Sequence, residues 1–235
     1  MSASFTPLIS ATLCFVLGHF ILSARPIRDY LIETLRRNGF LGVYSIFAAT
    51  SFIWMNLAYA RAPFEDLWGD PTWIRWLGII AMPLATVLLA TGAMTANPAA
   101  LGFGDLLEQG RKPTGVQKIT RHPVQWAIAI WAGIHFLANG DMASAIFFGG
   151  FLTLSILGMV HMECRKRAEN DALWTRFTDQ SSFFPFGAIM AGRVKTSLKE
   201  IGPNRIAVGI ILYLVLLFGH RIAIDVPLLP QFSGI

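Results

Sequence analysis

The chain has 235 residues, of which 54% are hydrophobic and only 14% are charged, with a mean hydropathy of +0.54. This composition is too apolar for a soluble globular domain of the same length and excludes that class. The net charge of +5 comes from basic loops between apolar runs, which argues against a nucleic-acid partner.

Six apolar runs are long enough to cross a membrane. A run of about 17 to 25 apolar residues spans a hydrocarbon core of about 30 Å as a helix. Lipid offers no hydrogen-bond partner to an open backbone, so the pattern predicts an all-α polytopic bundle of about six transmembrane helices. One membrane domain over residues 1–235 is expected. In chain order the runs cover about 7–24, 40–60, 74–95, 123–138, 143–162 and 205–221.

The segments between the runs carry unequal positive charge. Those after the first, third and fifth runs hold most of the 19 Lys and Arg residues. By the positive-inside rule these three segments lie in the cytoplasm. Both termini are then predicted to lie outside it.

Two connecting segments add local detail. The turn Asn139-Gly140-Asp141 joins the fourth and fifth runs and is short enough to force an antiparallel hairpin. The segment 163–204 begins with a helical pattern over 164–177 and continues through Phe183-Phe184-Pro185-Phe186, which is apolar but too short to cross. This inner loop is predicted to lie on the membrane surface, with membrane lipid as a partner.

Two histidines lie within apolar runs, His19 in the first and His135 in the fourth. A titratable ring in hydrocarbon is costly, so such residues usually face the bundle interior. Two imidazoles from different helices can hold one haem, and hydrogen bonds to neighbouring helices are the alternative role. Their depths differ, because at ~1.5 Å per residue His19 lies about 8 Å and His135 about 18 Å from the inner ends of their runs. His161 and His220 end their runs and are interpreted as interfacial.

The sequence Arg121-His122-Pro123 stands at the inner rim of the fourth run, and proline suits the first turn of a helix. An interfacial Arg-His pair can bind an anion such as a phosphate, a carboxylate or a haem propionate. A snorkelling arginine beside a helix-starting proline is the structural alternative. Asn139 shares a helix stripe with His135.

The order of these features resembles the NnrU family of bacterial membrane proteins. The matching stretches are Leu17-Gly18-His19, Tyr59-Ala60-Arg61, Arg121-His122-Pro123 and the run from Trp131 to Asp141, of which the last is the most specific. The resemblance covers about residues 5 to 165. It implies a multi-pass protein of the bacterial inner membrane with a role in nitrite and nitric oxide metabolism (denitrification).

The NnrU family is similar to the 15-cis-zeta-carotene isomerases of plants and cyanobacteria, which are thought to use a non-covalent haem b with histidine ligands. Carried over by motif, the metal ligands fall on His19 and His135. Arg121, His122 and Asn139 are the further cofactor-binding candidates. The protein would then act in denitrification, or as a haem-dependent cis-trans isomerase of an apolar polyene such as zeta-carotene in carotenoid biosynthesis. The residues alone assign no catalytic group.

Two alternatives remain open at this point. Arg121-His122-Pro123 is similar to the R-H-P motif of isoprenylcysteine carboxyl methyltransferases, with Glu169 in place of their downstream acidic segment. That similarity implies S-adenosylmethionine held by Arg121, His122 and Glu169, although Gln125 stands where those enzymes usually have an aromatic residue. The other alternative is a non-catalytic assembly or regulatory partner of a respiratory complex.

Overall fold

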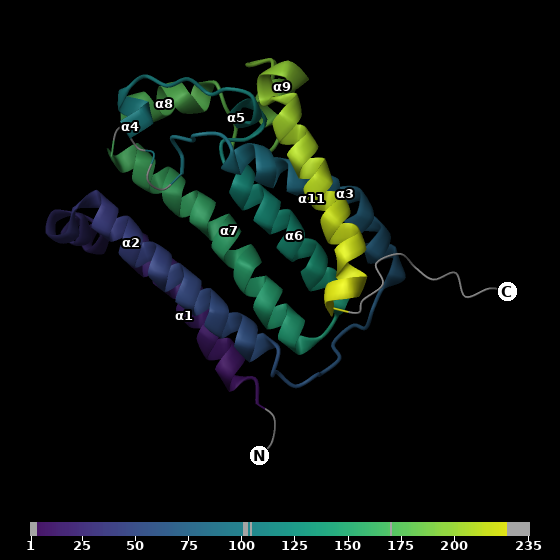
Figure 1. Cartoon of the computed structure of the whole chain (residues 1–235). Helices are drawn as coiled ribbons and strands as arrows, with labels where there is room; N and C mark the ends of the chain where they lie inside the picture. Colours follow the sequence, from purple (N-terminus) through teal and green to yellow (C-terminus); the bar gives the residue numbers. More distant parts are fainter. Residues whose placement is uncertain (1–3, 101–102, 104, 170, 225–235) are drawn as a thin grey trace.

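The computed structural model describes residues 4–100, 103, 105–169 and 171–224, and these form a bundle of long helices with shorter ones at one end (Figure 1). Within that part of the chain there is no strand, only an isolated bridge between Asp66 and Asp141. The helices are α1 (Thr6–Ser23), α2 (Arg25–Tyr59), α3 (Thr72–Ala93), α4 (Asp105–Glu108), α5 (Val116–Ile119), α6 (Pro123–Asn139), α7 (Met142–Glu169), α8 (Asp171–Asp179), α9 (Gly187–Met190), α10 (Leu198–Ile201) and α11 (Pro203–Ile224).

Five of the described helices are long and apolar enough to cross a membrane, namely α1, α2, α3, α7 and α11. Helix α6 has 17 residues and a length of about 25 Å. Each of the six apolar runs in the sequence therefore corresponds to one helix of the structure. The prediction of an all-α polytopic membrane bundle is confirmed.

Helix α7 lies in the middle of the bundle (Figure 1). It packs against α1 and α2 on one side and against α6 on the other. Helix α6 in turn packs on α3, and α3 packs on α11. The bundle thus consists of two groups of helices that share α7.

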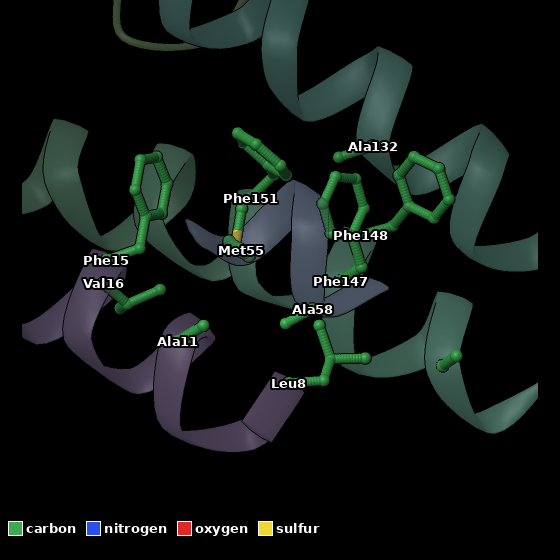
Figure 2. Packing of buried hydrophobic residues seen from close by; sticks show 11 residues of the cluster. Leu8, Ala11, Phe15, Val16, Met55, Ala58, Ala132, Phe147, Phe148 and Phe151 are labelled. Carbon is green, nitrogen blue, oxygen red and sulfur yellow. The ribbon is translucent and has the colours of Figure 1, made fainter. Parts of the chain in front are cut away.

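The largest cluster of buried residues fills the contact between α1, α2, α7 and α6 (Figure 2). Phe15 of α1 and Phe147, Phe148 and Phe151 of α7 are its aromatic members. Gly150 permits the close approach of α1, because a Cβ atom at this position would lie 2.4 Å from Cγ2 of Thr12. Small residues at such crossings are the usual packing device in membranes.

The turn between α6 and α7 lies at one end of the bundle, which we call the hairpin end. A second segment, the loop after α2, contacts this turn. Gly140 adopts φ 62°, which ends α6 in the left-handed conformation that glycine tolerates. Oδ1 of Asp141 then accepts a hydrogen bond of 2.9 Å from the amide of Ser144 and caps α7. The carbonyl of Gly140 accepts hydrogen bonds from the amides of Leu67 (2.8 Å) and Trp68 (3.1 Å), so the loop after α2 lies on this turn.

At the opposite end of the bundle, which we call the basic end, the helix boundaries differ from the expected ones. Helix α2 begins at Arg25 instead of residue 40, with a break at Arg36 (φ 59°, ψ 170°) that separates an additional helical stretch. Helix α7 continues to Glu169 instead of ending at residue 162. The expected helix over 164–177 is therefore the end of α7 followed by α8, with Asn170 outside the described residues. The two extensions contact each other through an ion pair between Arg28 of α2 and Glu169 of α7.

Candidate functional site

His19 lies on α1 in contact with aromatic side chains. Its ring centre is 4.6 Å from that of Phe15, 5.4 Å from Tyr44 and 5.9 Å from Phe47, the last two on α2. Its Nδ1 donates a hydrogen bond of 2.5 Å to the carbonyl of Phe15. Within the described ring contacts, no second imidazole lies beside His19.

His135 lies on α6 and does have a second imidazole beside it. Its ring centre is 6.1 Å from that of His220 on α11, with 37° between the ring planes. The rings of Trp131 and Phe148 lie 5.2 Å and 5.1 Å from it. Nδ1 of His135 donates to the carbonyl of Trp131 at 2.8 Å, and Nδ1 of His220 donates to the carbonyl of Leu216 at 2.9 Å. Each ring therefore has its Nδ1 engaged in its own helix.

The structure does not bring His19 and His135 into contact. Helix α7 lies between their helices, and three rings connect them in succession: Phe15 with Phe151 at 5.3 Å, and Phe151 with Trp131 at 5.3 Å (Figure 2 shows Phe15 and Phe151). His19 contacts the first of these rings and His135 the last.

The remaining cofactor-binding candidates lie at opposite ends of α6. Nδ2 of Asn139 donates to the carbonyl of His135 at 2.8 Å, within the same helix. Arg121 and His122 precede the first turn of α6, about 20 Å along the axis from His135. The described contacts thus separate this pair from His135 and Asn139.

Arg121 and His122 instead form a buried cluster with Glu163 of α7. Nε of Arg121 donates to Oε1 of Glu163 at 2.5 Å, and Nη2 donates to Oε2 at 3.1 Å. Nε2 of His122 lies 2.6 Å from the same Oε1. The two parallel bonds from one guanidinium to one carboxylate are the strong bidentate geometry. This cluster joins the start of α6 to α7 at the basic end.

The surroundings of this cluster bury most of it. His122 is 1% exposed, and the ring of Phe183 lies 5.6 Å from its ring. The guanidinium of Arg121 lies 6.0 Å from the ring centre of Trp174, at cation–π distance. Burial lowers the pKa of His122 below the ordinary value of 6.5, and the hydrogen bond to Glu163 opposes this effect in part. Because a carboxylate oxygen can only accept, a neutral His122 carries its hydrogen on Nε2 and donates a hydrogen bond to Oε1 of Glu163.

Sequence reasoning missed Glu163, and it placed Glu169 in the wrong neighbourhood for the R-H-P comparison. The signal for Glu163 was a carboxylate one residue after an apolar run, because a charge at that depth needs a partner inside the protein. Glu169 contacts Arg28, Arg165 and Lys166 and has no described contact with Arg121 or His122. The structure thus does not bring together the three residues that the methyltransferase comparison implied.

The fold and these clusters define an all-α polytopic membrane protein whose buried charges are paired at one end of the bundle. Of its histidines, His19, His135 and His220 each donate from Nδ1 to a carbonyl of their own helix. His161 of α7 instead lies with its Nε2 3.5 Å from the carbonyl of Ser23 at the end of α1. The sequence profile of the family described as NnrU protein matches residues 7–228, and the chain belongs to this family. The match extends beyond residue 165, where the motif resemblance ended. No curated protein and no solved structure matches the chain.

Proposed function

We propose that this protein binds haem b non-covalently within the membrane, through His135 and His220, and uses it in nitrogen-oxide metabolism. The single observation that carries the proposal is the pair of imidazoles from α6 and α11, with ring centres 6.1 Å apart. A metal held by two imidazole nitrogens at about 2 Å each has ring centres about 6 Å apart. This pairing keeps His135 of the expected pair, and His220 takes the place of His19.

The hydrogen bonds of the two rings support the same assignment. Both Nδ1 atoms donate to backbone carbonyls, which fixes the tautomer and makes Nε2 the atom available to a metal. Ligating histidines almost always have such an orienting partner on their other nitrogen. The aromatic rings of Trp131 and Phe148 provide the apolar surroundings that a porphyrin requires. When bound there, the haem supplies one-electron chemistry.

Absorption spectroscopy on the purified full-length protein tests the proposal. Wild-type protein from haem-replete cells should show a Soret band of bis-imidazole haem. His135→Ala and His220→Ala should each lose most of this band. His19→Ala is the matched control, because this ring has the same type of hydrogen bond but no imidazole neighbour in the described contacts, and it should keep the band.

Three results would contradict the proposal. A colourless wild type would exclude haem binding, and a stoichiometric partner protein in the same preparation would favour the assembly role. A band that His19→Ala abolishes and His220→Ala preserves would restore the pairing of His19 with His135. If the protein binds haem but cells that lack its gene consume nitrite and nitric oxide at an unchanged rate, the nitrogen-oxide role would be excluded.

A haem-dependent polyene isomerase is the second candidate, and an apolar groove favours it. The groove lies on α1 and contacts Phe47 of α2, and its α1 lining is Leu13, Cys14, Leu17, Gly18, Ile21 and Leu22. It runs along the helix for more than two turns, which suits a long hydrocarbon chain. The test is co-expression in cells that accumulate 15-cis-zeta-carotene, with chromatography of the extracted isomers. An unchanged isomer ratio with the haem-loaded protein would exclude this reaction.

A further inference from the structure

A cavity of about 390 Å³ lies at the basic end, between the two parts of α2, the C-terminal turns of α7 and the short helix α4. Ligand sites in proteins begin at about 300 Å³, so this volume suits a small charged group. The kink at Arg36 allows both parts of α2 to line it. Its basic side chains are Arg25, Arg28, Arg37, Arg165 and Lys166.

One carboxylate is shared by three of these cations. Glu169 lies 3.4 Å from Nη1 of Arg28, 3.6 Å from Nη1 of Arg165 and 3.5 Å from Nζ of Lys166. Each distance exceeds the ~2.7–2.9 Å of a charge-assisted hydrogen bond, so Glu169 satisfies none of the three completely. Arg28 has a second partner in Asp29 at 2.9 Å. Within the described residues, Arg165 and Lys166 have ion pairs with Glu169 alone.

The charge excess lies on the α7 side of the cavity. On the facing side, Arg37 forms an ion pair with Asp105 of α4, and Glu108 of α4 adds a carboxylate to the lining. Three positive charges from Arg28, Arg165 and Lys166 stand against the two carboxylates of Asp29 and Glu169. Arg25 adds a further positive charge, with its Nη2 donating to the carbonyl of Ala168 at 3.3 Å.

The buried cations of this cavity do not have a complete set of partners within the protein. Arg165 and Lys166 are 6% and 5% exposed. The Nε atoms of Arg165 and Arg28 are buried and have no hydrogen-bond partner. A buried donor without an acceptor costs the full desolvation of the group, and a buried charge without a complete partner costs more. Both unfilled donors belong to residues that line the same cavity.

We propose that this cavity binds a phosphate group, carried either by a phospholipid headgroup or by a soluble phosphate ester. A tetrahedral phosphate offers several acceptor oxygens, which match the cavity-lining guanidinium groups of Arg165 and Arg28 and the ammonium of Lys166. Arg121 was the anion-binding candidate in the sequence, but its guanidinium already binds Glu163 through two bonds. The phosphate site lies instead where guanidinium donors remain unfilled, and it does not depend on the proposed haem.

Thermal unfolding of the full-length protein in nanodiscs tests this site. Inorganic phosphate, added to protein in discs of neutral phosphatidylcholine, is the probe for a soluble phosphate ester. Discs that contain phosphatidylglycerol, without added phosphate, are the probe for a lipid headgroup. At least one of these should raise Tm over neutral discs in chloride of equal ionic strength. The arm that responds identifies the source of the phosphate.

Variants assign the effect to the cavity. Arg165→Gln should weaken the response to phosphate about tenfold or more, since hydrogen bonds to charged groups are among the stronger ones. Arg165→Lys keeps the charge but loses the planar donors, and should give an intermediate response. Arg176→Gln is the matched control, because Arg176 is an exposed residue of α8 outside the cavity lining. Arg28→Gln provides a second test at a less buried position if Arg165→Gln does not fold.

Two outcomes would overturn the proposal. The first is a Tm that neither phosphate nor phosphatidylglycerol changes relative to chloride in neutral discs. The second is a response that Arg165→Gln and Arg28→Gln retain at the level of Arg176→Gln, because the added anion would then act on the general basic surface.

Discussion

Glu163 of α7 holds His122 and Arg121 together at the basic end, with its Oε1 2.6 Å from Nε2 of His122. The side chains of Arg121 and Glu163 are only 10% and 17% exposed. Removal of one partner from a buried ion pair leaves an uncompensated charge and destabilises a protein by about 3–5 kcal/mol. We expect Glu163→Ala to lower the free energy of unfolding by this amount, measured by denaturation in detergent. Glu33→Ala, at an exposed site of α2, is the control, and a loss no larger than its loss would contradict a structural role for the cluster.

Stability should depend on pH through His122. Burial lowers the pKa of His122 from 6.5, so below this pH the unfolded chain takes up a proton that the folded protein does not. Stability is therefore lost as the pH falls below about 6.5, and the loss continues until the pH reaches the lower pKa of the folded protein. The measurement is Tm over mildly acidic to neutral pH for wild type and His122→Gln. The variant should show a flatter dependence, and parallel curves would exclude His122 as the group responsible.

Gly140 should be intolerant of any side chain. Its φ is 62°, and a Cβ atom there would lie 1.7 Å from the carbonyl oxygen of Gly69. Left-handed backbone costs an L-residue about 1–2 kcal/mol, and the collision with Gly69 adds to this. Gly140→Ala should therefore lower Tm clearly. Gly133→Ala is the control, because Gly133 lies inside α6, the helix that Gly140 ends, and its new Cβ would meet no neighbouring atom within 4 Å. It should leave Tm unchanged or raise it, since alanine favours helix.

Arg36 is a site where glycine should stabilise the protein. It adopts φ 59° and ψ 170° without being glycine, in a region that costs other residues about 1–3 kcal/mol. Arg36→Gly should therefore raise Tm. Glu33→Gly, in the regular helical stretch before the break, should lower it by the usual helix penalty of about 1 kcal/mol. Equal losses in both variants would show that Arg36 is not strained.

Hydropathy was sufficient to predict the fold class, an all-α polytopic membrane bundle. Each of the six apolar runs became a helix because hydrocarbon length and backbone hydrogen bonding leave no other solution. The short turn at Gly140 was also predictable, since a connection of three residues cannot separate two spans widely. The R-H-P comparison located Arg121 and His122 as a special pair, but not the carboxylate that they bind.

What hydropathy could not predict is which helices are neighbours. His220 was interpreted as interfacial because it ends its run. Its contact with His135 of α6 depends on where α11 lies against α3, which packs on α6. The extension of α2 to Arg25 was hidden for a related reason. In the sequence, charged residues such as Arg28 and Arg165 are typical of a solvated loop. In the structure both lie within ion-pair distance of the same carboxylate, that of Glu169.

The central place of α7 also has a consequence for biogenesis. Helices α1 and α2 pack on each other and on α7, whereas α3 packs on α6 and α11. During synthesis α1, α2 and α3 are therefore made before α6 and α7, the helices that connect them. The group of α1 and α2 and the group of α3 and α11 can join only after α6 and α7 have inserted. A nascent chain that ends before α6 therefore has α1, α2 and α3 without the helices on which they pack.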